Sequence, residues 1–280
     1  MLRTAIRHRL EKVIGKGRLE DHWGYQCYLR LFRRDHFAHV RAEREFCRGL
    51  ISESGNELVS DVGANHGHKA RLFSQIAKKV VCIEPGVASL RALHARFDGK
   101  QAIPIVPKGV GPIEGFGVFH EFGSEDAFNT FSEKWSRAVA SGDESRPARS
   151  ELSTTTVPLT TLDQLISEYG LPGDIKIDVE GYELPALKGL TLHVPLIRFE
   201  CKLPEFEGET VEAVNRLILL DPAARFNFCT TEPPVHLAES TWLSAPAILE
   251  AVTSRRWRFM EVYCRMNARS AGPSDEAQRG

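Results

Sequence analysis

The spacing of apolar positions changes near residue 57 and divides the chain into two regions. Before that point, Leu2, Ile6 and Leu10 recur at near-helical intervals and predict an amphipathic helix over residues 2–14 with a basic opposite face. A second, aromatic-rich helical region is expected from about Tyr25 to Leu50. We expect it to cover the domain that follows or to form part of a lid over its site.

From Glu57 onward, short apolar segments alternate with helical stretches. This alternation is typical of βαβ units and a parallel sheet. Strands are predicted at residues 58–62, 79–84, 102–106, 174–179, 196–201, 225–229 and 258–263. Helices are predicted at residues 69–77, 88–97, 184–190 and 209–220, with one more running from about residue 163 to Tyr169.

The segment 107–150 is rich in glycine, serine and charged residues, and it predicts an inserted loop with possible short strands near residues 117–121. We therefore expect an N-terminal helical extension over residues 1–54 and a main domain over 55–267. The tail, residues 268–280, is expected to be disordered.

Composition adds constraints on the type of protein. A length of 280 residues with 42% hydrophobic residues is enough for a sizeable core. Residues 1–50 hold twelve Lys or Arg against six Asp or Glu, so the remainder is mildly acidic, which disfavours nucleic-acid binding. The six cysteines form no close pair, a pattern of reduced thiols that favours a cytoplasmic location. We expect neither a membrane span nor a secretion signal, because no apolar run reaches about 18 residues.

The most informative motif is Asp61-Val-Gly-Ala-Asn-His-Gly67, placed where a predicted strand turns into a helix. Glycine at positions 63 and 67 permits a tight bend and lets a ligand approach the backbone. Glu84 ends the next predicted strand, where an acidic side chain can accept hydrogen bonds from two ribose hydroxyls. A strand, a glycine turn and an acidic strand end together predict a site for an adenosine-containing cofactor.

The turn also indicates which cofactor that is. A dinucleotide site needs G-x-G-x-x-G to hold a pyrophosphate, whereas this turn reads G-A-N-H-G and follows Asp61. The Asp61 carboxylate would repel a pyrophosphate, but it suits a zwitterionic ligand with a positive sulfur. A nicotinamide-dependent oxidoreductase is therefore the disfavoured alternative.

A second motif, from Ile175 to Glu183, gathers acidic residues and Lys176 at the end of a strong strand. Open α/β sheets present their ligand crevice at this end of the strands. Glu200, at the end of the next strand, is expected to project into the same crevice. Charge gathered at this density favours a role in substrate binding, metal binding or proton transfer.

Taken together, D-V-G-A-N-x-G, E-P after the second strand, V-P-L-T-T-L-D and I-K-I-D-V-E-G-Y-E-L-P-A-L-K-G resemble the FkbM family of S-adenosylmethionine-dependent methyltransferases. The resemblance covers roughly residues 57–202. It implies an α/β fold with a Rossmann-like class I methyltransferase sheet and helices on both faces, and O-methylation of a sugar or natural-product hydroxyl. The resemblance also implies which residues bind the cofactor: its methionine end would contact Asp61, Gly63, Ala64, Asn65 and Gly67. The ribose of the cofactor would contact Glu84. The site of methyl transfer would be lined by Asp178, Glu180 and Glu183.

An alcohol needs a base to accept its proton during methyl transfer, and the candidates are Asp178, Glu180 and Glu200. A divalent metal is possible among three carboxylates but is not favoured, because Lys176 can neutralise the cluster. A non-catalytic subunit that binds the cofactor or a glycan remains an alternative. The expected partner is a small-molecule or saccharide acceptor, and the sequence does not identify the acceptor or an oligomeric state.

Overall fold

The computed structural model describes residues 34–55, 57–122, 126–142, 148–151 and 153–267. The predicted basic helix over residues 2–14, the first part of the second helical region and the C-terminal tail lie outside the described residues. The limits predicted for the extension, the main domain and the tail stay predictions.

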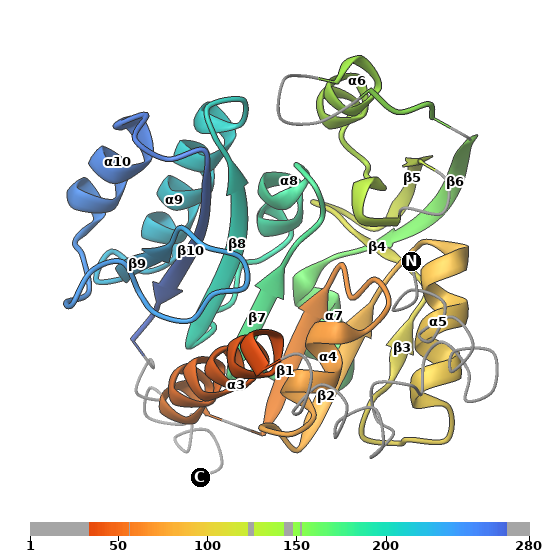
Figure 1. The fold of residues 1–280 in the computed structure, drawn as a ribbon, viewed down its shortest axis with the longest axis horizontal. Helices are drawn as coiled ribbons and strands as arrows, with labels where there is room; N and C mark the ends of the chain where they lie inside the picture. Colours follow the sequence, from red (N-terminus) through yellow and green to blue (C-terminus); the bar gives the residue numbers. More distant parts are fainter. Residues whose placement is uncertain (1–33, 56, 123–125, 143–147, 152, 268–280) are drawn as a thin grey trace, which may run out of the picture.

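A seven-stranded sheet forms the centre of the fold, in the order β3-β2-β1-β7-β8-β10-β9 (Figure 1). Neighbouring strands are parallel from β3 to β8, and β10 runs antiparallel to both of its neighbours. The strands are β1 (Leu58–Val62), β2 (Lys79–Ile83), β3 (Ile105–Val106), β7 (Asp174–Ile177), β8 (Leu196–Lys202), β9 (Arg225–Cys229) and β10 (Phe259–Arg265). The predicted parallel sheet is confirmed.

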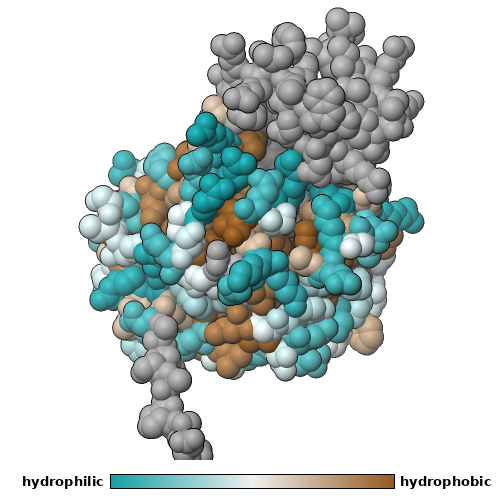
Figure 2. Space-filling view, turned by 90° about the horizontal axis from the view of Figure 1, so that it is seen from below, coloured by the Kyte–Doolittle hydropathy of each residue, from teal (hydrophilic) through white to brown (hydrophobic). Residues whose placement is uncertain are grey.

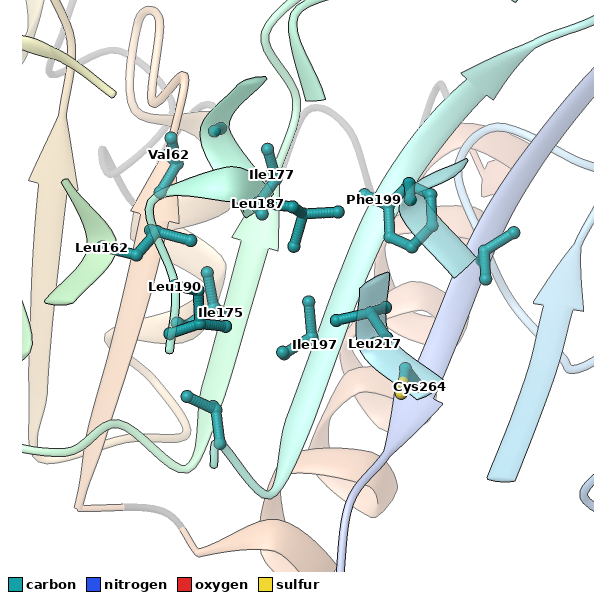
Figure 3. Packing of buried hydrophobic residues seen from close by; sticks show 14 of the residues in the cluster. Val62, Leu162, Ile175, Ile177, Leu187, Leu190, Ile197, Phe199, Leu217 and Cys264 are labelled. Atoms are coloured by element: carbon teal, nitrogen blue, oxygen red, sulfur yellow. The ribbon is translucent and has the colours of Figure 1, made fainter. Parts of the chain in front are cut away.

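Helices cover both faces of this sheet. On one face α7 (Leu162–Tyr169), α8 (Glu183–Lys188), α9 (Glu207–Leu220) and α10 (Ala245–Thr253) contribute to the largest apolar cluster. Figure 3 shows Ile175, Ile177 and Ile197 of the strands facing Leu187 and Leu217 of these helices. On the other face α3 (Arg34–Ser54), α4 (His68–Phe73) and α5 (Val87–Phe97) pack in a second cluster. The result is a three-layer arrangement with the sheet in the middle.

A smaller sheet in the order β4-β6-β5 lies beside the carboxyl ends of β1 and β2 (Figure 1). It consists of β4 (Gly109–Val110), β5 (Gly115–Glu121) and β6 (Ser153–Thr160), and it is accompanied by the 3₁₀ helix η2 (Asp126–Phe128) and by α6 (Glu133–Ser141). The prediction of a loop over 107–150 with short strands was therefore only partly right. It missed α6, whose start is capped by the Ser132 hydroxyl accepting a hydrogen bond from the Trp135 backbone N–H at 3.2 Å.

Several predicted boundaries also shift. Helix α4 ends at Phe73 instead of Ala77, and β3 begins at Ile105 instead of Ala102. Strand β7 ends at Ile177, because the following residues turn through left-handed conformations at Glu180 (φ 54°) and Gly181 (φ 84°). Helix α10 had no prediction. Apolar periodicity fixes the existence of an element better than its ends.

The surface seen from below in Figure 2 mixes hydrophilic residues with smaller hydrophobic areas. Within the part of the chain that the structure describes, no helix combines the length and the apolar character needed to cross a membrane.

A buried ion pair lies on the α3 and α4 face of the sheet. Arg198 Nη2 is 2.6 Å from Asp174 Oδ2, and both side chains are at most 2% exposed. The guanidinium also stacks on the Phe73 ring, with its central carbon 4.7 Å from the ring centroid. A second buried carboxylate, Glu261, lies farther from the guanidinium, at 4.0 Å, so Asp174 is the main compensating charge for Arg198.

We predict that Asp174→Ala lowers the free energy of unfolding by about 3–5 kcal/mol, because it removes the short ion pair of the buried Arg198 and leaves Glu261, at 4.0 Å, to compensate its charge. Urea denaturation measures the change. The matched control is Glu133→Ala, which removes an exposed pair with Arg137 and should leave stability nearly unchanged. Equal effects of the two substitutions would contradict this reading of the buried pair.

Candidate functional site

A cavity of ≈ 420 Å³ opens at the carboxyl ends of β1, β2, β7 and β8. Its wall is built from the turn after β1, the end of β2, the smaller sheet, α6 and the residues that follow β7. This is the edge at which parallel sheets bind ligands, and the volume lies in the usual range for small-molecule sites. The structure therefore brings together, in one cavity, segments that are far apart in the sequence.

The turn after β1 requires glycine at position 63. Gly63 has φ 80°, and a Cβ at this position would lie 1.8 Å from the Asp178 carbonyl oxygen. The Gly63 and Ala64 backbone N–H groups both donate to the Ile83 carbonyl oxygen, at 3.0 and 3.1 Å. The turn is thus held against β2 and against the chain that leaves β7.

Asn65 and Gly67 have different places in the same turn. Asn65 lines the cavity in the left-handed region, with φ 47°, and its side-chain Oδ1 accepts a hydrogen bond from Ser89 Oγ at 3.2 Å. Gly67 has φ 77° and packs behind the turn, where a Cβ would lie 2.6 Å from Phe97 Cε2. Of the glycines predicted to contact the cofactor, Gly63 lines the cavity and Gly67 does not.

Glu84 is buried at the end of β2, and it lines the cavity as predicted. Its Oε2 accepts a hydrogen bond from the Asn65 backbone N–H at 2.9 Å, and its Oε1 accepts one from Gly86 N–H at 2.8 Å. These bonds fix the position of the carboxylate at the cavity wall. A pair of adjacent hydroxyl groups is a suitable donor for such a carboxylate.

Asp61 lies behind the cavity wall, whereas the sequence predicted that it contacts the cofactor. Its side chain is fully buried, lies outside the cavity lining, and has no hydrogen-bond partner for either carboxylate oxygen among the described residues. It is in register with Lys176 on the neighbouring strand β7. Burial raises the pKa of Asp61, and the nearby Lys176 ammonium opposes that rise.

The three predicted catalytic carboxylates, Asp178, Glu180 and Glu200, all line this cavity. Asp178 Oδ2 lies 2.7 Å from Lys176 Nζ. Lys202 Nζ lies 3.0 Å from Glu180 Oε2 and 3.5 Å from Glu200 Oε2. Lysine ammonium groups therefore separate the acids, which would otherwise repel one another.

Burial and charge act differently on the three acids. Burial favours protonation of Asp178, but Lys176 and Lys202 outweigh it and hold the pKa of Asp178 below its ordinary value. Burial raises the pKa of Glu180 to about 7, in spite of the opposing Lys202 charge. Burial and the neighbouring Asp178 charge raise the pKa of Glu200 well above its ordinary value. At neutral pH Glu180 is therefore near its midpoint, while the pKa values of Asp178 and Glu200 are moved in opposite directions.

Glu183 does not face the cavity as the sequence reading expected. Its Oε1 accepts hydrogen bonds from the backbone N–H groups of Val179 and Gly181, at 3.2 and 3.1 Å, and it is absent from the cavity lining among the described residues. A carboxylate at the start of α8 is drawn to the free N–H groups of the preceding turn. Glu183 therefore shapes the loop that carries Glu180.

Sequence reasoning missed Lys202 and the aromatic side of the cavity. Phe131 and Trp135, from the segment predicted as a loop, line the cavity together with Phe259 from the start of β10. Lys202 Nζ lies 5.0 Å from the centroid of the Trp135 ring. The alternation in β8 that places Glu200 at the cavity also places Lys202 there, two residues on, and this signal was available in the sequence.

Among the residues described, no group of three or more His, Cys, Asp or Glu side chains is arranged to hold a metal ion. The carboxylates that come together in the cavity are associated with Lys176 and Lys202.

The chain matches the methyltransferase FkbM domain over residues 61–228. No curated protein matched the chain. The chain is similar to a solved methyltransferase FkbM from Methylobacillus flagellatus KT, at 17% identity and a TM-score of 0.45, covering 75% of this chain and 44% of that one. The chain thus spans less than half the length of that relative.

Two further solved structures are similar at lower identity. A precorrin-6y C5,15-methyltransferase from Geobacter metallireducens GS-15 is 8% identical with a TM-score of 0.40, covering 80% of this chain and 87% of that one. An rRNA methylase from Streptococcus thermophilus is 11% identical with a TM-score of 0.40, covering 79% and 95%. The central sheet with helices on both faces confirms the predicted Rossmann-like class I fold. The match to the FkbM domain extends over more than half of the chain, and the chain therefore belongs to the FkbM methyltransferase family.

Proposed function

We propose that this chain uses S-adenosylmethionine to methylate a hydroxyl group of a small molecule or saccharide. The observation that carries the proposal is that the glycine turn, Glu84 and the carboxylates after β7 and β8 line one cavity. Cofactor-binding groups and groups able to accept a proton are thus side by side. The family supplies the methyltransferase activity, and the residues of the cavity support the choice of donor and acceptor.

The residues present fit the cofactor. Glu84 would hold the ribose hydroxyls, while Gly63, Ala64 and Asn65 would contact the methionine end. The buried Asp61 carboxyl group lacks a hydrogen-bond partner in the described structure, and it lies behind the turn that would contact the cationic end of the cofactor. Gly67 contributes by shaping the turn. When bound, S-adenosylmethionine supplies a methyl group activated by its sulfonium charge.

The acceptor side combines aromatic rings with carboxyl groups. Trp135 and Phe259 provide flat apolar surfaces, and Glu180 and Glu200 provide hydrogen-bonding groups at the same cavity. A saccharide ring or a hydroxylated natural product has matching apolar faces and polar edges. These features support a small hydroxylated acceptor.

Glu180 is the best candidate for the base that accepts the hydroxyl proton. A general base works best when its pKa is near the operating pH, and burial raises the pKa of Glu180 to about 7. Glu180 also has a left-handed backbone in a non-glycine residue, a conformation that clusters at functional sites. Asp178, paired with Lys176, is suited to orienting groups in the cavity. The raised pKa of Glu200 favours its protonated form, which can donate a hydrogen bond to the acceptor.

The same residues support proposals about partners and location. The buried cysteines that the structure describes are all free, which suits a reducing compartment, so we infer a cytoplasmic enzyme. We also infer a small-molecule acceptor and not a nucleic acid, since residues outside the basic N-terminal region carry net negative charge.

We predict that the wild-type protein binds S-adenosylhomocysteine in isothermal calorimetry and gives no heat with NAD. Gly63→Val should abolish that binding, because its Cβ would overlap the Asp178 carbonyl group. Gly208→Ala is the matched control, since a Cβ there meets nothing within 4 Å. Binding of NAD in place of S-adenosylhomocysteine, or normal affinity in Gly63→Val, would refute the site assignment.

We predict that Glu180→Gln lowers methyl transfer by about 10²–10⁴-fold while S-adenosylhomocysteine affinity stays close to wild type. The wild-type rate should rise as pH passes through about 7, because only the ionised carboxylate accepts a proton and the pKa of Glu180 is about 7. Transfer of a labelled methyl group to a panel of hydroxylated acceptors measures both effects. A flat pH profile with an unimpaired Glu180→Gln variant would remove Glu180 as the base, and cofactor binding without transfer to any acceptor would favour a non-catalytic subunit.

We predict that the methyl-transfer rate is unchanged after dialysis against a metal chelator. The reason is that Lys176 and Lys202 already compensate the carboxylates of the cavity. The rate is compared before and after treatment and again after Mg²⁺ or Mn²⁺ is added back. Loss of activity that either ion restores would show that a metal takes part.

A further inference from the structure

Lys202 occupies the point where three parts of the cavity wall meet. It is the last residue of β8, and its ammonium group lies 3.0 Å from Glu180 Oε2 on the loop after β7. The same group lies 3.5 Å from Glu200 Oε2 on β8 and 5.0 Å from the Trp135 ring centroid on α6. The side chain is only 20% exposed, so solvent screens these interactions weakly.

Both the backbone and the side-chain carboxylate of Glu180 have a polar partner. The Thr130 hydroxyl donates a hydrogen bond of 2.7 Å to the Glu180 carbonyl oxygen, and this contact supports the left-handed backbone. The carboxylate at the other end of the residue is paired with Lys202. Lys202 is thus the ionic partner of the carboxylate, while Thr130 holds the backbone.

A single ammonium group between two carboxyl groups also affects their charges unequally. The distance to Glu180 is shorter than the distance to Glu200, so the attraction favours charge on Glu180. Glu200 has Asp178 as a further negative neighbour, and burial and that charge raise the pKa of Glu200. The other charged groups facing Glu180 are Asp178 and Glu183, both of which oppose its ionisation.

We propose that Lys202 is a positioning residue that orients the Glu180 carboxylate toward the acceptor and makes Glu180, and not Glu200, the ionised member of the pair. This role rests on the proposed methyl transfer with Glu180 as base. It gives the two glutamates separate tasks: Glu180 accepts the hydroxyl proton, while Glu200 keeps its own proton and donates a hydrogen bond.

The test measures the protonation of Glu180 directly, without any acceptor. Isotope-edited infrared spectra of protein with ¹³C-labelled glutamate are recorded across a pH titration, and subtraction of the Glu180→Gln spectra isolates the Glu180 carboxyl band. In Lys202→Met the midpoint should move upward by about 1–3 pH units, because the compensating charge is lost. Lys202→Arg keeps the charge and should restore a midpoint near that of the wild type.

Two further variants separate this effect from general disturbance. Lys188→Met removes a lysine that is paired on the surface with Glu212, and it should leave the midpoint unchanged. Glu200→Gln should leave the midpoint close to that of the wild type, because an uncharged Glu200 is replaced by an uncharged amide and no negative charge is lost. This arm keeps the test decisive if Lys202→Met does not fold.

An unchanged midpoint in folded Lys202→Met, an equal shift in Lys188→Met, or a clear downward shift in Glu200→Gln, which would show that Glu200 is charged, would overturn the proposal. Calorimetry with S-adenosylhomocysteine is run on the same preparations. Failure of the proposed function would appear there as absent binding in the wild type, while failure of the Lys202 role would appear only in the titration.

Discussion

The close approach of two chain segments at Gly63 is the constraint on which the site depends. The turn after β1 passes so near the Asp178 carbonyl group that a Cβ at position 63 would lie 1.8 Å from its oxygen. The Asp178 backbone N–H, in turn, donates to the Val62 carbonyl oxygen at 3.0 Å, which extends the pairing of β1 with β7. Only glycine fits this contact, and the contact brings the cofactor side and the proton-accepting side of the cavity together.

Electrostatic interactions shift the pKa of each acid in the cavity differently. The carboxylates come from neighbouring strands because parallel strands end at one edge, and burial alone would protonate them all. Lys176, paired with Asp178, and Lys202, placed between Glu180 and Glu200, oppose this effect. Pairs of titratable groups whose surroundings separate their pKa values are typical of sites that carry out proton transfer. The two lysines are therefore as important for the proposed proton transfer as the acids themselves.

The sequence allowed the central sheet to be predicted because each of its strands is a short apolar run bounded by turn residues. It also allowed Glu84, Asp178, Glu180 and Glu200 to be placed at one edge, since strand ends meet there. The sequence did not show which of the predicted residues reach the surface of the cavity. Asp61 and Gly67 lie behind the cavity wall, and Glu183 accepts hydrogen bonds from the loop backbone. Nor did the sequence identify α6, a helix of nine residues whose Trp135 and Val139 pack with Phe206 from a distant segment. Such contacts depend on tertiary structure, which periodicity does not encode.

The most direct test of the account is a crystal structure of the protein with S-adenosylhomocysteine. The account predicts the ribose hydroxyls within hydrogen-bonding distance of Glu84, and the sulfur on the side of the cavity where Asp178 and Glu180 lie. A ligand bound elsewhere, or one whose ribose makes no contact with Glu84, would contradict it.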